Sequence, residues 1–466
     1  MERDNVWKDY TKKEKKELDK LCKNYREFLD LAKTERECAA AAVKMAEKSG
    51  YRNLEEIVKK GETLCPGDKV YAVNMKKSVA LFQIGTEPME RGMAILGAHI
   101  DSPRIDIKQN PLYEDTELAY LDTHYYGGIK KYQWVTLPLA IHGVVAKKNG
   151  EIITICIGED EGDPVFCITD LLIHLAHERM EKKADKVIEG EALDILFGSI
   201  PLKGAEKDAV TQNVLAVLKE KYDMEEEDFL SAELEVVPAG KARESGIDAS
   251  MILGYGQDDR VCAYTSLLAM LEVEGTKHTT CCLLVDKEEI GSVGATGMQS
   301  AVFENTVAEI MNCLGQYSEL AVRRCLNHSK MLSSDVSAAF DPIYASAYEK
   351  KNAAYFGRGM VFNKFTGSRG KSGSNDANAE FMAQIRSVME DAKVAYQTAE
   401  LGKVDIGGGG TIAYIMALYG MEVIDCGVAV LNMHAPWELT SKADIYETKK
   451  GYVVFLENIF NGAQNA

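Results

Sequence analysis

The feature that most constrains the fold is an alternation of helical patterns and short apolar runs, interrupted once by a long middle segment of different character. The first sixty residues carry apolar positions near the 3.6-residue repeat of a helix. Short apolar runs then predict strands at 70–73, 79–84 and 94–98. Beyond the middle segment the alternation resumes, with strands expected at 280–285, 330–333 and 423–427. This order predicts an α/β fold with a mainly parallel sheet flanked by helices.

The middle segment has the features of an insertion. Apolar stretches at 134–145 and 152–157 flank Asn149-Gly150, a strong short-range signal for a β-hairpin. Helical patterns are expected from about Ile168 to Met180 and from Val210 to Tyr222. We therefore predict that residues 1–109 and 246–466 form the α/β domain and that residues 110–245 form an inserted domain.

Charge and cysteine usage narrow the class of protein. The 466 residues include 54 Lys and Arg against 72 Asp and Glu, a net charge of −18. That balance argues against nucleic-acid binding and against docking on an anionic membrane. The first ten residues lack the apolar stretch of a signal peptide, and no run approaches the roughly 18 apolar residues of a spanning helix. The eleven cysteines show no C-x-x-C spacing, so we expect reduced, mostly buried thiols in a cytoplasmic protein.

Acidic residues and histidines follow five strand-like runs, at the edge where open α/β sheets bind ligands. The five segments are His99 to Asp101, Asp258 to Arg260, Asp286 to Ile290, Ser334-Asp335 and His434 to Glu438. Each one alone is a weak signal, since acidic pairs are usually solvated and a lone histidine usually serves packing. Together they supply two histidines, two aspartates and a glutamate, a ligand set that suits two divalent ions such as zinc, manganese or cobalt.

The chemistry of a two-metal site suggests how these residues divide the work. A carboxylate can bridge two ions held roughly 3.5–4 Å apart. In a loop, one member of the pair Glu288-Glu289 can bind metal while the other acts as general base. Asp101 lies two residues after His99 and can hold its imidazole in place.

Six motifs appear in order along nearly the whole chain. They are His-Ile-Asp-Ser-Pro-Arg, Gln-Asp-Asp-Arg, Glu-Glu-Ile-Gly-Ser, Ser-Ser-Asp-Val-Ser, Gly-Ser-Arg-Gly-Lys-Ser-Gly-Ser-Asn-Asp-Ala and His-Ala-Pro-Trp-Glu. The set resembles the aspartyl aminopeptidase family of dinuclear metallopeptidases.

The resemblance implies a role for each candidate residue. His99 and Asp335 would hold one metal ion, Glu289 and His434 the other, and Asp258 would bridge the two. Glu288 would be the general base, and Asp101 would support His99. The ions implied are two per subunit, with zinc expected and cobalt or manganese as alternatives.

The resemblance also implies an architecture and an assembly. The family has a proteolytic α/β domain interrupted by a β-rich dimerisation domain, and its members form tetrahedral dodecamers built from dimers. A histidine of the inserted domain reaches the neighbouring subunit's active site and helps to hold the scissile carbonyl. The matching residue is His174.

Substrate specificity is the least determined property. The family removes N-terminal Asp or Glu from peptides with the help of basic groups, for which Lys364, Arg369 and Lys371 are candidates. Gly409 is expected beside the substrate, in a glycine run that forms a tight turn or an anion site at a helix N-terminus. The stretches 126–134 and 363–366 depart from the family's usual motifs, so a neutral or broader preference stays open.

Two other functions remain as alternatives. A metallo-carboxypeptidase or N-deacylase could use a related catalytic domain. A metal-bound scaffold without activity is disfavoured, because Glu288 and the five ligand candidates are all present. The partners expected are peptide substrates and further copies of the chain, with no nucleic acid and no membrane.

Overall fold

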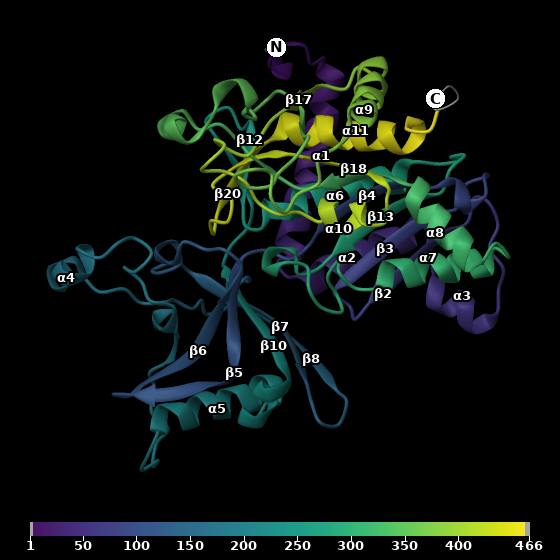
Figure 1. Cartoon of the computed structure of the whole chain (residues 1–466). Helices are drawn as coiled ribbons and strands as arrows, with labels where there is room; N and C mark the ends of the chain where they lie inside the picture. The colour runs from purple at the N-terminus through teal and green to yellow at the C-terminus, as the bar shows by residue number, and fades with distance from the viewer. Residues whose placement is uncertain (1–2, 462–466) are drawn as a thin grey trace. The chain divides into compact units, whose positions relative to one another are not determined.

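The computed structural model describes residues 3–461, and the chain divides into two compact units (Figure 1). The large unit comprises Met1–Asp101, Ala242–Met433 and Glu438–Ala466, and the small unit comprises Ser102–Lys241 and His434–Trp437. The boundaries predicted from the sequence lie at 109/110 and 245/246. Strand β5 (Arg104–Asp115) runs across the first of these positions and belongs wholly to the small unit.

The large unit is built on a nine-stranded sheet. In sheet order its strands are β1 (Arg52–Asn53), β2 (Lys69–Asn74), β3 (Ser78–Gln83), β13 (Thr280–Val285), β4 (Ala94–His99), β14 (Lys330–Ser334), β18 (Glu422–Gly427), β16 (Met360–Asn363) and β17 (Tyr396–Thr398). The central strands β13, β4, β14 and β18 run parallel. Antiparallel pairs join β2 to β3, β3 to β13 and β18 to β16. The predicted mainly parallel α/β sheet is confirmed at its centre.

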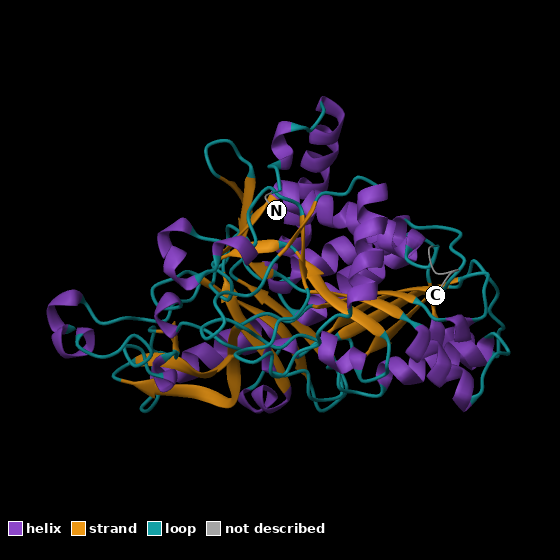
Figure 2. Ribbon diagram, turned by 45° about the horizontal axis from the view of Figure 1, so that its top comes forward, coloured by secondary structure: helices purple, strands orange, loops and turns teal. Residues whose placement is uncertain are grey.

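The central strands are apolar on both sides because helices cover both faces of the sheet (Figure 2). Every residue of β13 and of β4 is buried. Successive β13 side chains point to opposite faces, so Cys282 and Leu284 enter one core while Cys281 and Leu283 enter the other. A continuous apolar run is what a strand buried on both faces requires.

The helices of the large unit divide between the two cores. The first core contains residues of α1 (Lys12–Leu31), α2 (Glu35–Lys48), α6 (Gln257–Glu272), α9 (Ala379–Asp391) and α11 (Lys442–Asn458). The second contains residues of α3 (Leu54–Lys60), α7 (Val302–Cys313), α8 (Glu319–His328) and α10 (Ala413–Ala417). Local sequence sets where the first helices begin: α1 starts at a capping box of Thr11 and Glu14, and α2 at one of Thr34 and Glu37.

A five-stranded sheet in the same unit supports one part of the site. Its order is β11 (Arg243–Ser245), β12 (Met251–Gly254), β20 (Glu438–Ser441), β19 (Ala429–Leu431) and β15 (Ser337–Ala338). Strand β12 leads directly into α6, and β20 pairs with β12.

The small unit is built on an antiparallel sheet. Its order is β8 (Ile152–Ile157), β7 (Leu139–Ala146), β10 (Ala232–Pro238), β5, β6 (Leu118–Tyr126) and β9 (Ile195–Gly198). Strands β7 and β8 form the hairpin predicted around Asn149-Gly150. Helix α5 (Ala209–Tyr222) agrees with the predicted helix, and its Val214 lies against Gly198 of β9.

The helix expected from Ile168 to Met180 is wrong for most of its length. Only the 3-10 turn Ile173–Leu175 and the short helix α4 (His177–Met180) are helical there. Leu172, Ile173 and Leu175 are 53%, 66% and 68% exposed. Their spacing is typical of the buried face of a helix, but these side chains do not enter the core of this chain.

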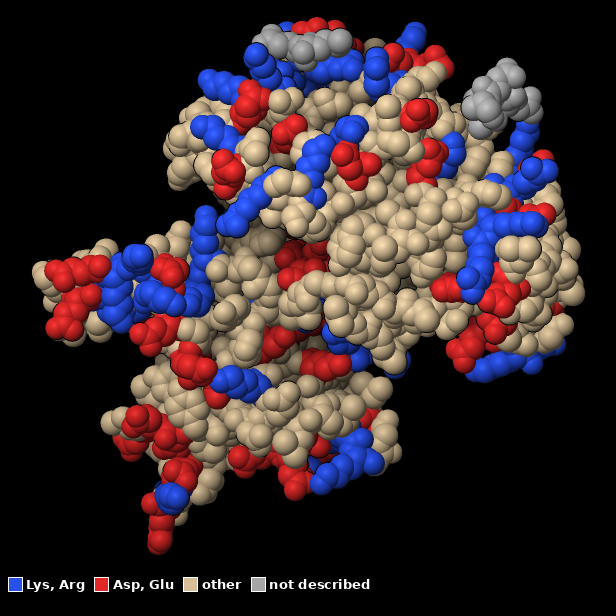
Figure 3. Space-filling model, in the orientation of Figure 1, with Lys and Arg blue, Asp and Glu red and all other residues tan. Residues whose placement is uncertain are grey.

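The helices, cysteines and surface charges of the described residues are those of an ordinary globular protein. Within residues 3–461 no helix is long and apolar enough to cross a membrane. All eleven cysteines are free thiols, and eight of them are buried. Acidic and basic side chains are interspersed over the face drawn in Figure 3, so the net charge of −18 is not gathered there into one acidic field.

Candidate metal centre

Three neighbouring parallel strands bring the candidate ligands of the large unit to one edge of the sheet. His99 is the last residue of β4, the turn Glu288–Ile290 follows β13, and Asp335 follows β14. Because these strands run parallel side by side, their carboxyl ends meet at the same edge. Asp258 joins them from the first turn of α6.

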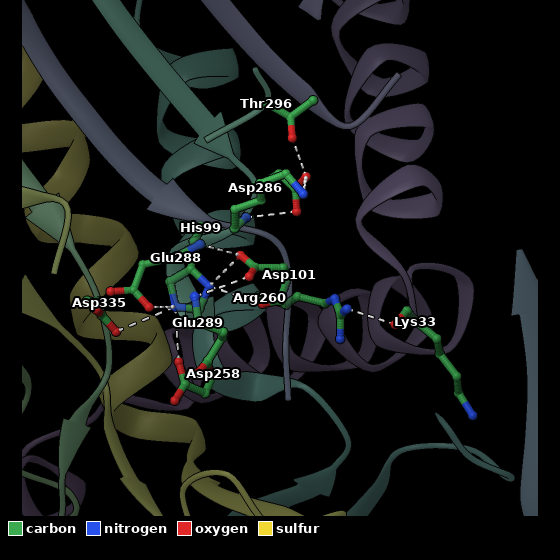
Figure 4. A network of polar contacts seen from close by, with 11 residues as sticks. Lys33, His99, Asp101, Asp258, Arg260, Asp286, Glu288, Glu289, Thr296 and Asp335 are labelled. Atoms are coloured by element: carbon green, nitrogen blue, oxygen red, sulfur yellow. Dashed lines mark hydrogen bonds and ion pairs between the residues drawn. The ribbon is translucent and has the colours of Figure 1, made fainter. Parts of the chain in front are cut away.

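His99 lies at the centre of the cluster (Figure 4). Its Nε2 is 3.2 Å from Asp258 Oδ1 and 3.8 Å from both Glu288 Oε2 and Asp335 Oδ1. Ligand-type atoms of His99, Asp258 and Asp335 lie within 4.8 Å of one another, as do those of His99, Glu288 and Glu289. An imidazole surrounded by carboxylates at these separations fits zinc, manganese or cobalt. Both glutamates are close enough to bind, so their division into ligand and base stays a prediction.

Asp101 ties two of these elements together. The Nδ1 of His99 is 3.0 Å from the carbonyl oxygen of Asp101 and 3.3 Å from its Oδ1. The carboxylate of Asp101 also accepts hydrogen bonds from the backbone N–H groups of Glu288 and Glu289, both at 3.2 Å. The fully buried side chain of Asp101 therefore orients both the imidazole at the end of β4 and the acidic turn after β13.

Asp258 is held by a residue to which the sequence analysis gave no role. The N–H of Asp258 donates to Glu438 Oε2 at 2.9 Å, and Gln257 Nε2 donates to the carbonyl oxygen of Glu438 at 2.7 Å. The peptide bond between Asp258 and Asp259 is cis. Glu438, the first residue of β20, thereby fixes the turn that presents the proposed bridging carboxylate.

Burial and crowding shift the proton affinities of the cluster. Burial raises the pKa of Asp335 well above its usual range, and the nearby carboxyl of Asp259 raises it further. Burial alone lowers the pKa of His99, but hydrogen bonds with Asp101 and Asp258 outweigh that effect and raise it well above its usual value. Divalent cations favour ionised carboxylates and a neutral imidazole, so they would offset the repulsion within this donor set. The residues fit the metal ions they are predicted to hold.

The small unit contains two candidate histidines, His434 and His174. His434 Nδ1 is 2.8 Å from the carbonyl oxygen of Gly128, which can only accept a hydrogen bond, so Nδ1 donates and Nε2 is left for a metal. His174 is exposed on the turn Ile173–Leu175. Their roles as metal ligand and shared catalytic residue stay predictions.

The candidate specificity residues gather around one acidic side chain. Asp376 pairs with Lys364 at 2.7 Å and with Lys371 at 2.9 Å, and these two bonds lower the pKa of its carboxyl. Arg369 and Lys371 line a cavity of about 420 Å³. Two of the three predicted basic groups are thus partly neutralised within the chain.

Gly409 lies beside the same segment. Its N–H donates to the carbonyl oxygen of Thr366 at 2.9 Å. The glycine run Gly407–Gly410 is therefore packed against residues 366–368, where an added Cβ at Gly408 would lie 2.3 Å from Ser368 Cα. A turn at 404–406 precedes the run, and the Gly409 N–H is used within the chain.

Asp425 is a buried acid that the sequence analysis did not single out. It lies on β18 directly across from Ser333 of β14, and the Thr411 hydroxyl donates to its Oδ1. Burial raises its pKa to about 7, while the hydrogen bond from Thr411 lowers it and the charge of Glu288 raises it. The signal that could have revealed it is an acid inside an otherwise apolar strand, since an aspartate is rarely fully buried.

Comparison with known proteins decides the family. Residues 28–456 match the family model described as aminopeptidase I zinc metalloprotease (M18). The chain belongs to the M18 family. It is 65% identical to "Probable M18 family aminopeptidase 1" of Clostridium acetobutylicum over 455 residues, which cover 97% of this chain and 98% of that protein.

Two crystal structures of M18 relatives share the fold. Aminopeptidase I from Clostridium acetobutylicum is 62% identical with a TM-score of 0.92, covering 98% of this chain and all of that one. An M18 aminopeptidase from Thermotoga maritima is 45% identical with a TM-score of 0.93, covering 98% of this chain and 99% of that one. The protein is therefore an M18 metallo-aminopeptidase, a hydrolase that acts at the N-terminus of peptides.

Replacing Asp425 with Asn should change how the stability of this M18 protein depends on pH. The ordinary pKa of the group is 3.8 and its pKa in the folded chain is about 7, so the folded state binds this proton more tightly. Its contribution to stability is therefore present below about pH 4 and is lost as the pH rises to about 7. Asp425→Asn lacks this loss, so its free energy of unfolding should exceed that of the wild type by an amount that grows from about 1 kcal/mol at pH 4.5 to about 4 kcal/mol above pH 7, taking the low-pH difference as reference.

The measurement is thermal unfolding of metal-free protein across that pH range. Asp391→Asn, which removes an exposed carboxyl at the end of α9, is the matched control and should run parallel to the wild type. Parallel curves for Asp425→Asn as well would contradict the prediction.

Proposed function

We propose that the chain is a dinuclear aminopeptidase in which Glu288 is the general base. The observation that carries the proposal is the convergence of His99, Asp258, Glu288, Glu289 and Asp335 at one sheet edge. His99 and Asp335 would hold one ion, Glu289 and His434 the other, and Asp258 both. Zinc is the expected metal, in keeping with the description of the family, with cobalt or manganese as alternatives.

The proposed mechanism assigns each residue one task. Two bound divalent ions supply Lewis acidity, which lowers the pKa of the attacking water toward about 7. Glu288 takes the proton from this water and passes it to the leaving amine. Asp101 keeps both the imidazole of His99 and the Glu288 turn in position through the hydrogen bonds described above.

A substrate panel tests this function. The purified chain, supplied with zinc, manganese or cobalt, is assayed on anilides of Asp, Glu, Leu and Lys and on N-acylated amino acids, with metal content measured in parallel. We expect two ions per chain and turnover of free-amine substrates only. Turnover of blocked substrates alone would favour the N-deacylase alternative, and one ion per chain would refute the dinuclear site.

Changing Glu288 to Gln should abolish turnover while leaving metal binding intact. The amide keeps the size of the side chain but cannot accept and return a proton, so kcat should fall by about 10²–10⁴. Metal analysis should match the wild type. Glu309→Gln, at an exposed position of α7, is the control and should retain full activity. Undiminished turnover in Glu288→Gln would remove this residue from the mechanism.

The preference for Asp or Glu at the substrate N-terminus is the next part of the proposal. Arg369, Lys371 and Lys403 line one cavity together with one acid, Glu400, and this excess of basic groups supports an acidic substrate side chain. The pairing of Lys364 and Lys371 with Asp376 favours the second candidate, a neutral or broad preference, because it offsets part of that charge.

Removing the charge of Asp376 should separate these two candidates. In Asp376→Asn both lysines lose their internal carboxylate, so kcat/KM for aspartyl over leucyl anilide should rise about three- to tenfold. The exposed aspartate change Asp391→Asn should leave this ratio unchanged. An unchanged ratio in Asp376→Asn would show that Lys364 and Lys371 do not contact the substrate side chain.

The final part of the proposal is a homo-oligomer, a dodecamer built from dimers, in which His174 completes the neighbouring active site. The exposed apolar residues Leu172, Ile173 and Leu175 beside His174 support an intermolecular contact. A more distant structure of the same fold, 19% identical with a TM-score of 0.75, is described as the mApe1 dodecamer of S. cerevesiae.

His174→Phe should lower kcat without changing the metal content. A lost hydrogen-bond donor at the scissile carbonyl typically costs about 10²-fold or more. His177→Phe, at a second exposed histidine three residues away, is the control. Co-assembly of His174→Phe with Glu288→Gln should restore activity that neither variant has alone, because some sites then receive both intact residues. Absence of such recovery would refute the shared site.

A further inference from the structure

A cysteine, a histidine and a glutamate that have no role in the proposed mechanism meet at the β7–β8 hairpin of the small unit. Cys156 of β8 lies directly across from His142 of β7, so their side chains point to the same face of the sheet. The Sγ of Cys156 is 3.9 Å from Nε2 of His142, and the same nitrogen is 3.2 Å from Oε1 of Glu159. The imidazole therefore contacts both the thiol and the carboxylate.

The thiol is the accessible member of this cluster. Strand β8 is an edge strand of the six-stranded sheet, and residues 152, 154 and 156 on one of its faces are all exposed. His142, by contrast, is 2% exposed, so packing holds its imidazole in place. A small molecule from solvent can thus reach the sulfur without any movement of the strand.

The arrangement of the three groups favours a reactive sulfur. The thiolate is the nucleophilic form of cysteine, and an ordinary thiol is only about 3% ionised at pH 7. The Nε2 of His142 can take the thiol proton, and the neighbouring carboxylate of Glu159 stabilises the imidazolium that forms. Cysteine hydrolases use the same division between a nucleophile, a base and a group that supports the base.

We propose that Cys156 is a modification site that forms a mixed disulfide with low-molecular-weight disulfides. The Cys156 thiolate attacks one sulfur of the disulfide R–S–S–R, so a new S–S bond to Cys156 forms while the bond between the two RS groups breaks. The leaving RS⁻ takes the proton from the His142 imidazolium and departs as RSH. The reacting disulfide is itself the oxidant, and the site lies entirely within the small unit.

Two observations favour an external disulfide as the reactant. All eleven cysteines are free thiols, so the second sulfur comes from another molecule. Within residues 3–461, the groups of three side chains with metal-binding separations all belong to the proposed metal centre, and Cys156, His142 and Glu159 are not among them. The cluster therefore fits sulfur exchange better than metal binding.

The chain provides an internal control for the test, since Cys65 is also exposed but no histidine contacts its thiol among residues 3–461. The full-length, metal-loaded protein is treated at pH 7 with the neutral reagent bis(2-hydroxyethyl) disulfide, and peptide mass spectrometry follows each thiol separately. Cys156 should react about three- to tenfold faster than Cys65, and a reductant should reverse the adduct. An equal or slower reaction at Cys156 in the wild type would overturn the site.

His142→Gln should lower the rate at Cys156 to about that of Cys65, because glutamine cannot take up the thiol proton. The rate at Cys65 should stay as in the wild type. His124→Gln, which removes an exposed histidine of β6 in the same unit, is the matched control and should keep the wild-type rate at Cys156. An unchanged rate at Cys156 in His142→Gln would show that the imidazole does not activate the thiol.

The eight buried cysteines report on the folded state of each variant, because they stay unreactive in an intact core. Glu159→Gln keeps the imidazole and should slow Cys156 by about two- to threefold, since the imidazolium loses its carboxylate. This variant supplies the test if His142→Gln exposes the buried thiols. A rate at Cys156 that neither variant lowers would refute the activated thiol.

Discussion

The contact on which the rest of the metal centre depends is the carboxylate of Asp101 against the backbone of Glu288 and Glu289. The same residue faces His99 Nδ1, so it joins the ends of β4 and β13 through one buried side chain. Several acids must lie close together there, and like charges in a buried site repel one another. Hydrogen bonds to fixed N–H groups hold that arrangement in place before any metal enters.

The sheet makes this arrangement rigid. Strands β13 and β4 pair over their whole length, and the N–H of Ile100 extends the pairing by donating to Val285. The two cores on opposite faces prevent either strand from shifting. The five-stranded sheet fixes the position of Asp258 as well, because Glu438 of that sheet accepts a hydrogen bond from the Asp258 N–H. Ligand geometry is thus determined by backbone pairing rather than by flexible side chains, as a preorganised site requires.

Charge acts locally in this protein, at distances much shorter than the molecule. The net charge of −18 says nothing about the charge of a particular pocket. Lys364 and Lys371 share Asp376, whereas Lys130 and Lys131 have no carboxylate partner among the described residues. Within a Debye length of about 8–10 Å such differences decide the local charge. Counting basic residues in the sequence treats the two lysine pairs as equal, and the structure distinguishes them.

The sequence by itself determined the α/β fold, the central strands, the β7–β8 hairpin, and which acids and histidines were candidates. These follow from local patterns: periodicity, turn residues, and polar groups placed after apolar runs. Only the tertiary structure decided that Ile168–Met180 is mostly not helical, that Glu438 holds Asp258, and that Asp425 is buried beside Thr411. Each of these features depends on a contact with a residue distant in sequence or on which side chains become buried. The spacing of residues along the chain does not encode such contacts.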